Sequence, residues 1–462
     1  MACWMKIIIC GAGQVGRGIA ERLALEDHDV TLIDTSDELI QLISNSRDIQ
    51  GIVGHGAHPD VLERAGAEDA DMIIAATFVD EVNMMACEVA HSLFEVPTKI
   101  ARVRAQAYLQ PEYQRMFSAA NTAIDVIISP EIAVGEMVLR RLALPGAFEA
   151  IYFVEHKVIA IGISLLEDCP VVNTPLSQLT ELFPDLNAVV VAVVRDGKTF
   201  VPHSNDQLLE GDQVFVIAEQ AQAARVLSLF GHDEKPPEHV TIGGGGNIGL
   251  YVAEKLEERD TGIKIRVIEI NEARAEAVSE KLRRAMVLNG SVLDEEILRE
   301  AGIHQTEAFI AVTDDDKVNV LSSMMAKQQG SLQAMALVSG LEVSSLRDRL
   351  GLDAIIDPRT VTTSSILKHV RRGRIRGVHP VLGGDGEIVE ADVLETSPMI
   401  GNKLRDTELP NGVRLGAIVR DNKVLMPTGD TEIKANDRVV LFSMSDQVQN
   451  LQHLFRVSLE YF

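Results

Sequence analysis

The 462-residue sequence predicts an α/β fold of two Rossmann-like parallel-sheet domains, each followed by a small α+β domain. The main observation is an internal duplication. The run IIICGAGQVG at residues 7–16 returns as VTIGGGGNIG at residues 240–249, and residues 61–83 match residues 297–319 at a constant offset of 236. The chain therefore carries two similar modules, and not one nucleotide module beside one catalytic module.

In the first half, short apolar runs alternate with helical patterns. Residues 6–10 form an apolar run that ends in a glycine-rich turn, and a helical pattern follows. Because the expected strands are continuously apolar, they indicate a parallel sheet covered by helices on both faces. We expect further strands at residues 30–34, 49–54, 71–77 and 98–104, and a sixth before Pro130, which opens a helix to about Arg141.

After residue 146 the pattern changes to short strands with a hairpin turn at Asp196–Gly197 and a closing helix, which indicates a small α+β domain. A linker with two prolines, residues 231–238, separates the halves. The second half repeats this order, with a basic helix through residues 368–376 and a second hairpin turn at Asp421–Asn422. The predicted domains are residues 5–128, 146–230, 239–357 and 378–458.

The composition narrows the class of protein. No apolar run approaches the roughly 20 residues that cross a bilayer, and the first residues lack a signal-peptide pattern. The four cysteines are scattered, which argues against disulfides or a zinc site. A formal charge of −25 disfavours nucleic acid as a partner. We therefore expect a cytoplasmic protein that does not bind nucleic acid.

The glycine-rich turn of the first half has the context of a dinucleotide site, because it follows an apolar strand and opens a helix. Its glycines allow a tight turn, close approach of a pyrophosphate and packing of the helix, while a carboxylate after the second strand would accept from ribose hydroxyls. That carboxylate would repel a 2′-phosphate, which favours NAD(H) over NADP(H). An empty Rossmann shell is the alternative. The candidate residues are Gly11, Ala12, Gly13, Gln14, Val15, Gly16, Asp34, Thr77 and Arg102.

The second glycine-rich turn keeps the same pattern but lacks a counterpart of Arg102, where the apolar Leu337 stands. Either an adenine nucleotide binds there or this copy is kept for assembly. Its candidate residues are Gly244, Gly246, Asn247, Ile248, Gly249 and Glu269.

Other polar residues have a structural and a functional interpretation. Arg102 and Arg104 would meet ligand phosphates or cap a buried carboxylate, and the basic segment 368–376 would be a solvated face or a docking site for an acidic surface. We expect helix capping for the Asp and Asn residues that follow the fourth strand of each half, which is compatible with lining a cleft. They are Asp80, Asn83, Asp316 and Asn319.

No catalytic or metal site is expected. Tyr251 and Lys255 have the YxxxK spacing of short-chain dehydrogenases but lie in the wrong helix, and His55 and His58 have no third ligand in view. An NAD-dependent dehydrogenase would need an acid or base beside the nicotinamide, and neither half supplies a recurring candidate. We therefore expect a protein that is not an enzyme.

Five segments together resemble the TrkA family, the cytosolic regulatory subunits of bacterial Trk potassium-uptake systems, built of tandem RCK (KTN) domains. The resemblance covers essentially the whole chain from Met5. It rests on residues 5–16, 66–83, 98–104, 126–131 and 363–375.

The resemblance implies a regulator that binds nucleotides and gates an integral-membrane potassium transporter subunit of the TrkH or TrkG type. It implies a homotetramer whose eight RCK units form a ring, peripheral on the cytoplasmic face of the inner membrane. NAD⁺ or NADH is the implied cofactor, with ATP or ADP as the alternative. Carried over by position, the nucleotide residues would be Gly11, Gly13, Gly16, Asp34 and Arg102, and then Gly244, Gly246, Gly249 and Glu269.

The sequence departs from the family pattern at two places. Gly54-His55-Gly56 stands where relatives often have G-D-A, and Gln14 stands where some ATP-responsive relatives carry Arg. Both departures favour NAD(H) over ATP at the first turn. An RCK regulator of another ion channel or of an efflux system is the remaining alternative.

Overall fold

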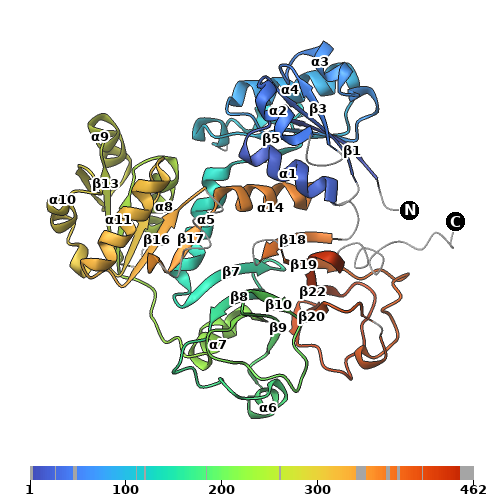
Figure 1. Ribbon diagram of the computed structural model, residues 1–462, viewed down its shortest axis with the longest axis vertical. Coiled ribbons are helices and arrows are strands. Elements are labelled where there is room, and N and C mark those ends of the chain that lie inside the picture. The colour runs from blue at the N-terminus through green and yellow to red at the C-terminus, as the bar shows by residue number, and fades with distance from the viewer. Residues whose placement is uncertain are drawn as a thin grey trace.

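The computed structural model describes residues 4–25, 28–44, 49–110, 112–118, 121–183, 185–259, 262–339, 350–370, 375–381, 385–407 and 409–447. Within them the chain forms two lobes with parallel sheets and two domains with antiparallel sheets (Figure 1). The order along the chain is lobe, small domain, lobe, small domain, as the duplication predicts.

The first lobe is a six-stranded parallel sheet in the order β3-β2-β1-β4-β5-β6. Because β1 lies between β2 and β4, the turn that follows it opens at the point where the strand order reverses, which is where α/β sheets bind ligands. The strands are β1 (Lys6–Cys10), β2 (Asp29–Asp34), β3 (Ile49–Val53), β4 (Met72–Ala75), β5 (Thr98–Arg102) and β6 (Val126–Ile128). The helices are α1 (Gln14–Leu25), α2 (Asp37–Ser44), α3 (Pro59–Arg64) and α4 (Asp80–Phe94), with 3₁₀ turns at Ala67–Asp69, Gln106–Leu109 and Gln114–Phe117.

The second lobe repeats this sheet in the order β14-β13-β12-β15-β16-β17. Its core consists of the apolar residues of the strands, which are buried on both faces. The strands are β12 (His239–Gly243), β13 (Lys264–Glu269), β14 (Met286–Asn289), β15 (Ala308–Ala311), β16 (Gln333–Leu337) and β17 (Ala354–Ile356). The helices are α8 (Asn247–Glu258), α9 (Glu272–Lys281), α10 (Glu295–Glu300) and α11 (Asp316–Gln328), with a 3₁₀ turn at Ile303–Gln305.

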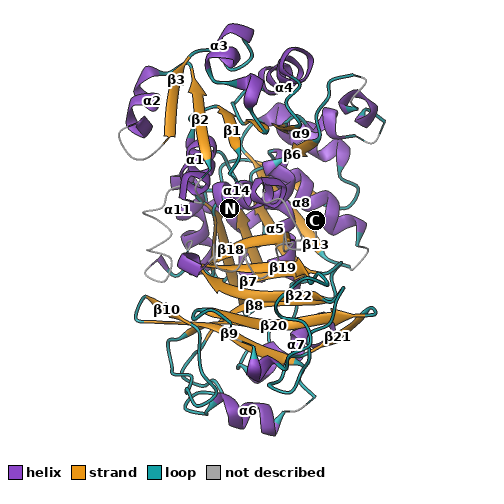
Figure 2. Cartoon of the chain, turned by 90° about the vertical axis from the view of Figure 1, so that its right-hand side faces the viewer, coloured by secondary structure: helices purple, strands orange, loops and turns teal. Residues whose placement is uncertain are grey.

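The small domains are five-stranded sheets in the orders β10-β9-β11-β8-β7 and β18-β19-β22-β20-β21. Their strands lie across the lower half of the molecule (Figure 2). One apolar cluster joins both sheets, with Phe215 and Ile217 from the first and Phe442 from the second. The elements are β7 (Ala147–Phe153), β8 (Val158–Ser164), α6 (Leu176–Leu182), β9 (Ala188–Arg195), β10 (Lys198–Phe200), β11 (Gln213–Glu219) and α7 (Ala223–Leu229), then β18 (Ile375–Val381), β19 (Gly386–Asp392), β20 (Val413–Arg420), β21 (Lys423–Leu425) and β22 (Arg438–Met444), with 3₁₀ turns at Gln220–Gln222, Leu404–Asp406 and Ser445–Gln447.

The two lobes exchange a helix. Helix α5 (Pro130–Ala143) leaves the first lobe and packs against α8, so that Val134 and Val138 are buried in the core of the second lobe. Helix α14 (Pro358–Val370) leaves the second lobe and packs against α1, where Ile366 joins the core of the first (Figure 1). Each lobe is therefore completed by the other half of the chain.

The two exchanged contacts differ in shape. A Cβ atom at Gly135 of α5 would lie 2.4 Å from the ring of Tyr251 on α8. At the corresponding contact of the other lobe the small residue is on the first helix, where Gly18 of α1 faces Thr363 of α14. In one pair the larger residue, Tyr251, is on the helix that opens the lobe, and in the other pair the larger residue, Thr363, is on the exchanged helix.

The basic segment at residues 368–376 is not one helix, contrary to the prediction. Helix α14 ends at Val370, residues 371–374 lie outside the described ranges, and β18 begins at Ile375. Arg376 therefore stands on a strand, and its Nε atom pairs with Asp392 at 2.6 Å.

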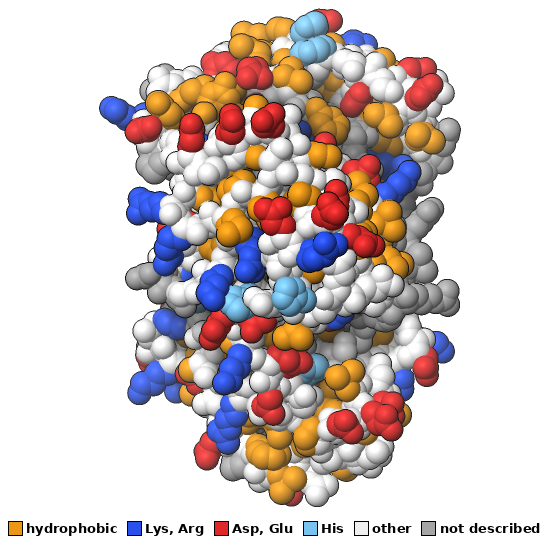
Figure 3. Space-filling model, turned by 90° about the vertical axis from the view of Figure 1, so that its left-hand side faces the viewer, with side chains coloured by type: hydrophobic (Ala, Val, Ile, Leu, Met, Phe, Trp, Pro, Cys, Tyr) orange, Lys and Arg blue, Asp and Glu red, His pale blue; other side chains and the backbone are white. Residues whose placement is uncertain are grey.

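The described helices are all too short or too polar to cross a membrane. On the face shown in Figure 3, acidic, basic and hydrophobic side chains are interspersed.

Candidate functional site

In both glycine-rich turns, backbone contacts leave no room for a side chain at the first and the last glycine. Gly11 has φ +108°, and a Cβ atom there would lie 3.0 Å from the backbone of Ala76 and Thr77. A Cβ atom at Gly16 would lie 1.8 Å from the carbonyl oxygen of Gly11. Gly244 and Gly249 repeat this geometry, with φ +108° and 1.9 Å. Glycine at these positions is therefore required by the turn and by the close packing of the helix on it.

The middle glycine of each turn faces open space. A Cβ atom at Gly246 would meet nothing within 4 Å, and one at Gly13 would meet only the Phe78 ring at 3.8 Å. Helices α1 and α8 begin at these turns, and their first N–H groups have no partner within the helix. The turns therefore offer a bare backbone and a helix N-terminus to an anion, which suits the pyrophosphate of a dinucleotide.

A carboxylate braces each turn. Asp34, the last residue of β2, accepts hydrogen bonds from the N–H groups of Ala12 (2.6 Å) and Ser36 (2.9 Å). Glu269, the last residue of β13, likewise accepts from Gly245 (2.7 Å) and Asn271 (2.9 Å). Each carboxylate oxygen uses one lone pair in these bonds and keeps another. The acid thus shapes the turn and can still accept from the ribose hydroxyls of a ligand.

The loop after the fourth strand is held by an asparagine in both lobes. The Thr77 N–H and hydroxyl groups both donate to Asn83 Oδ1, at 2.8 and 2.7 Å, and Asn83 Nδ2 donates to the Arg102 carbonyl at 2.9 Å. Thr313 and Asn319 repeat these bonds with the Leu337 carbonyl. Thr77 therefore borders the glycine turn through its backbone, and its side chain supports the loop.

The capping role expected for Asp80 is wrong. The residue before α4 is Val79, and no side chain caps this helix. The buried Asp80 carboxylate accepts instead from the N–H groups of Arg104 (3.0 Å) and Ala105 (2.8 Å), and so ties α4 to the end of β5. Asp316 similarly accepts from the Ser339 N–H, while its neighbour Asp315 caps α11.

Asn83 and Asn319 do not cap either, because their amides form the strand-bridging bonds described above. Within the fold both are fully buried. Each side chain instead joins the loop before its own helix to the end of the neighbouring strand, β5 or β16.

The two arginines of the first lobe take different roles. Arg104 Nε pairs at 2.8 Å with Glu131, a buried carboxylate at the start of α5, which matches the structural interpretation. The Arg102 guanidinium lies 5.7 Å from the centroid of Phe78, and its buried Nε atom makes no hydrogen bond within the described residues. Burial lowers the pKa of Arg102 from its usual value, and Glu131 opposes this shift. An anionic group of a ligand would supply the missing acceptor.

The sequence analysis did not single out Phe78 in the first lobe or Arg274 in the second. Phe78 is 75% exposed and stands between Gly13 and Arg102. In the second lobe, Asp314 stands at the position of Phe78 and Arg274 at that of Leu39. Arg274 Nε donates to the Gly245 carbonyl at 2.8 Å. Reading the whole duplication position by position, beyond its glycines, would have found them.

The weaker motifs have structural roles. The Tyr251 hydroxyl donates to Glu136 on α5 at 2.6 Å, and burial with this bond raises the pKa of Tyr251. The rings of His55 and His58 stack with centroids 4.5 Å apart. Among the described residues no group of His, Cys, Asp or Glu is arranged to hold a metal ion.

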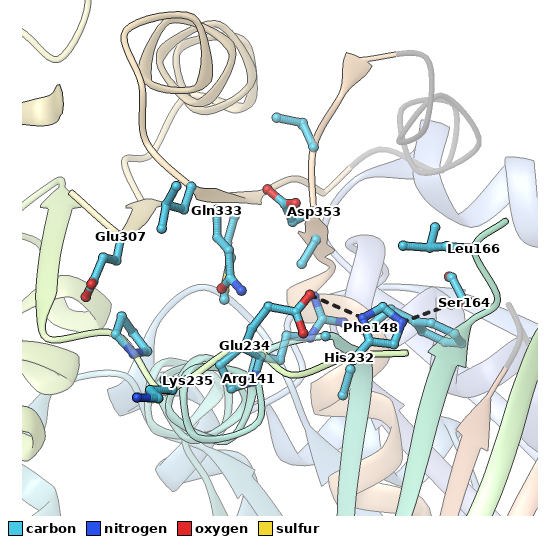
Figure 4. A pocket seen from close by; sticks show the side chains of 18 residues that line it. Arg141, Phe148, Ser164, Leu166, His232, Glu234, Lys235, Glu307, Gln333 and Asp353 are labelled. Atoms are coloured by element: carbon cyan, nitrogen blue, oxygen red, sulfur yellow. Dashed lines mark hydrogen bonds and ion pairs between the residues drawn. The ribbon is translucent and has the colours of Figure 1, made fainter. Parts of the chain in front are cut away.

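A separate cavity of about 590 Å³ lies where the linker meets the first small domain and the second lobe (Figure 4). His232 of the linker bonds to Glu234 (3.2 Å) and to the Ser164 carbonyl (3.0 Å) at its wall. Its other lining residues include Gln333, the first residue of β16, and Asp353, just before β17. The cavity therefore borders the amino ends of the strands, away from the glycine turn.

Comparison with known sequences gives the family of the chain. The model described as the TrkA-N domain matches residues 7–130 and 240–358, and that described as the TrkA-C domain matches residues 161–231 and 388–456. The chain belongs to the TrkA family. Among similar proteins are the "Trk system potassium uptake protein TrkA" of Azorhizobium caulinodans, 54% identical over 99% of this chain and 100% of that protein, and that of Halomonas elongata, 38% identical over 99% and 100%.

Solved structures show the same fold. The GsuK RCK domain has a TM-score of 0.60 at 19% identity and covers 98% of this chain and 95% of its own. The GsuK channel bound to NAD has a TM-score of 0.60 at 18% identity, over 98% of this chain and 79% of its own. The likeness supports the arrangement of tandem RCK units that the family resemblance implied.

Proposed function

We propose that this chain is the nucleotide-responsive regulatory subunit of a potassium-uptake system. It binds NAD(H) at its first glycine-rich turn and an adenine nucleotide at its second, and it gates an integral-membrane potassium transporter of the TrkH or TrkG type. The family supports the potassium-uptake role, since the relatives over the full chain carry that name. The two turns, each with a bracing carboxylate, support nucleotide binding.

The observation that carries this proposal is the exchange of α5 and α14. Arg104, just beyond the ligand-facing end of β5, is held through its backbone by Asp80 of α4 and pairs through its side chain with Glu131 at the start of α5. Helix α5 packs on α8, and α8 begins at the second glycine turn. A ligand at either turn therefore acts on a helix pair that both lobes share.

Through this shared helix pair, nucleotide binding at one turn can move one lobe relative to the other. A ligand shifts this movement only by the difference in its affinity for the two arrangements. The two turns differ in their charged residues, so different nucleotides can favour different arrangements. We expect a coupling free energy on the order of 1–3 kcal/mol between nucleotide and gate.

The regulator acts as a homotetrameric ring on the cytoplasmic face of the inner membrane. An apolar stripe on α4, formed by Met85, Val89 and Leu93 at four-residue spacing, supports contacts between copies, since Met85 and Leu93 are 53% and 60% exposed. Leu321 and Met325 repeat its first two positions on α11. Apolar stripes of this kind on surface helices favour burial against a partner.

The test is potassium flux through the membrane partner, reconstituted in vesicles with the full chain. Flux is measured with NADH, NAD⁺, ATP and ADP in turn, and calorimetry confirms binding of each under the same conditions. NADH and NAD⁺, or ATP and ADP, should change flux in opposite directions. Identical flux in all four, with binding confirmed, would make the sites structural and overturn the proposal.

A further inference from the structure

A cationic side chain, Arg274, borders the second glycine-rich turn. It lies on the other side of its turn from the position that Arg102 has in the first lobe. Arg274 lies on the first turn of α9, its Nε atom donates to the Gly245 carbonyl at 2.8 Å, and its Nη2 atom lies 3.5 Å from Asn247 Oδ1. Both acceptors belong to the turn and the start of α8. The guanidinium therefore already lies against the backbone that would face a ligand's phosphates.

The sheet order fixes which side of the turn each cation occupies. Helix α9 follows β13, which is the neighbour of β12 on one side. In the first lobe, Arg102 ends β5, which lies two strands from β1 on the other side. In a Rossmann site the adenosine ribose lies at the acid after the second strand, and the ligand crosses the turn towards the fourth and fifth strands. Arg274 thus stands at the adenosine end and Arg102 at the far end.

We propose that Arg274 is the phosphate-binding side chain of the second site and contacts the phosphate next to the adenosine ribose. The inference rests on the proposed nucleotide function. It adds that each site binds a different end of its ligand through an arginine. A guanidinium donates two parallel hydrogen bonds to a phosphate, and these charge-assisted bonds are stronger than its present bonds to neutral oxygens. Glu269 lies beside it to accept from the ribose hydroxyls.

At the end of the second site that is remote from the adenosine ribose, the basic side chain of the first site is lost and an acidic one is present. Asp314, which is exposed, replaces Phe78, and the apolar Leu337 replaces Arg102. A carboxylate there disfavours further phosphates, whereas the phosphate next to adenosine is common to all adenine nucleotides. The second site therefore selects ADP or a dinucleotide over ATP, and the first site holds the far end of its ligand through Arg102.

The experiment follows hydrogen exchange of the full chain during nucleotide titration, because residues 13–16 and 246–249 report on the two turns separately. Arg274→Gln should raise the ADP and NADH concentrations that half-protect residues 246–249 by about tenfold or more. Protection of residues 13–16 should stay unchanged. Lys281→Gln, which removes the same charge at the end of the same helix, is the matched control.

Arg274→Leu, which installs the residue of the first lobe, should give the same loss as Arg274→Gln, with an unchanged melting temperature for both. Protection of residues 246–249 by ADP at wild-type concentrations in both variants would overturn the inference while leaving the proposed function intact. If no nucleotide protects either turn in the wild-type chain, the proposed function itself fails, and this inference with it.

Discussion

The ring of Tyr251 on α8 occupies the space that a side chain at Gly135 of α5 would need, with 2.4 Å between Cδ1 and a Cβ atom at that position. The same ring reaches the next residue of α5, since its hydroxyl donates to Glu136. In the other lobe, Gly18 faces Thr363 with ordinary spacing. Each exchanged helix therefore fits the lobe that it covers and would fit the other one poorly.

Replacement of Gly135 by Thr should destabilise the chain by about 1–3 kcal/mol, because the new side chain overpacks the contact with Tyr251. Gly18→Ala should have no destabilising effect, since its Cβ atom has room and alanine favours helices. Denaturant unfolding of both variants measures this difference. The double variant Gly135→Thr with Tyr251→Gly should recover part of the loss, and strictly additive effects would contradict the packing argument.

Asp34→Ala should weaken NADH binding at the first turn by roughly 1.5–3 kcal/mol, the range for a hydrogen bond to a charged group. Since Asp34 also braces the Ala12 N–H, the melting temperature of the free variant must be measured beside the calorimetric affinity. Glu269→Ala is the matched control, and it should alter only the second turn. An unchanged affinity for NADH in the Asp34 variant would remove this residue from the site.

Asp314→Asn should strengthen ATP binding at the second turn by a few-fold, because one exposed like charge is worth roughly 0–1 kcal/mol. The gain should shrink at high salt, which screens exposed charges. ADP and NADH, which place less negative charge at that end, should change less. Competition titrations at two salt concentrations test this, and an equal gain for all three ligands would contradict it.

Cys10, at the end of β1 beneath the first turn, should resist alkylation in the folded chain. Burial raises the pKa of its thiol to about 12, and its Sγ atom lies 3.6 Å from the Gly56 carbonyl oxygen. Because the thiolate is the reactive form, iodoacetamide at pH 8 should label Cys10 slowly until the chain is denatured. Mass spectrometry of the labelled peptides measures the rate, with the denatured chain as the control. Labelling at equal rates in both states would show that the turn opens freely.

The chain should be a homotetramer of about 200 kDa, four times the 50.4 kDa of one chain. Met85→Glu places a charge in the apolar stripe of α4 and should lower the mass measured by light scattering. Leu182→Glu, at an exposed position of α6, should leave the mass unchanged. A wild-type mass of about 50 kDa at micromolar concentration would count heavily against the ring.

The sheets and their glycine turns could be predicted because each rests on local signals: apolar runs, a spaced set of glycines and an acid after the second strand. The exchange of α5 and α14 could not. The apolar face of a helix shows that it is buried, but not against which lobe. The helix expected through Arg376 failed for a different reason, since residues 375–381 pair with the next strand, β19, as an antiparallel hairpin, and the basic side chains of this segment give no signal of that strand.

In the candidate site, too, contacts between residues from different elements could not be predicted from the sequence. The brace that Asp34 forms was hidden because the carboxylate meets backbone groups, which every residue has. The contact between Arg102 and Phe78 joins residues from different loops. Arg274 was visible in principle, because the duplication aligns it with Leu39, but only its hydrogen bond to the Gly245 carbonyl shows that this position borders the turn.

The exchanged helices also bear on how such a chain can diverge. A half-length chain with one lobe would have to obtain its covering helix from a second copy, and a symmetric pair of this kind carries every substitution twice. Joining the halves through residues 231–238 removes that symmetry, because position 251 can change without position 18 and position 274 without position 39. A fused chain can therefore carry two different glycine-rich turns within the same pair of exchanged helices, whereas a symmetric dimer of half-length chains cannot.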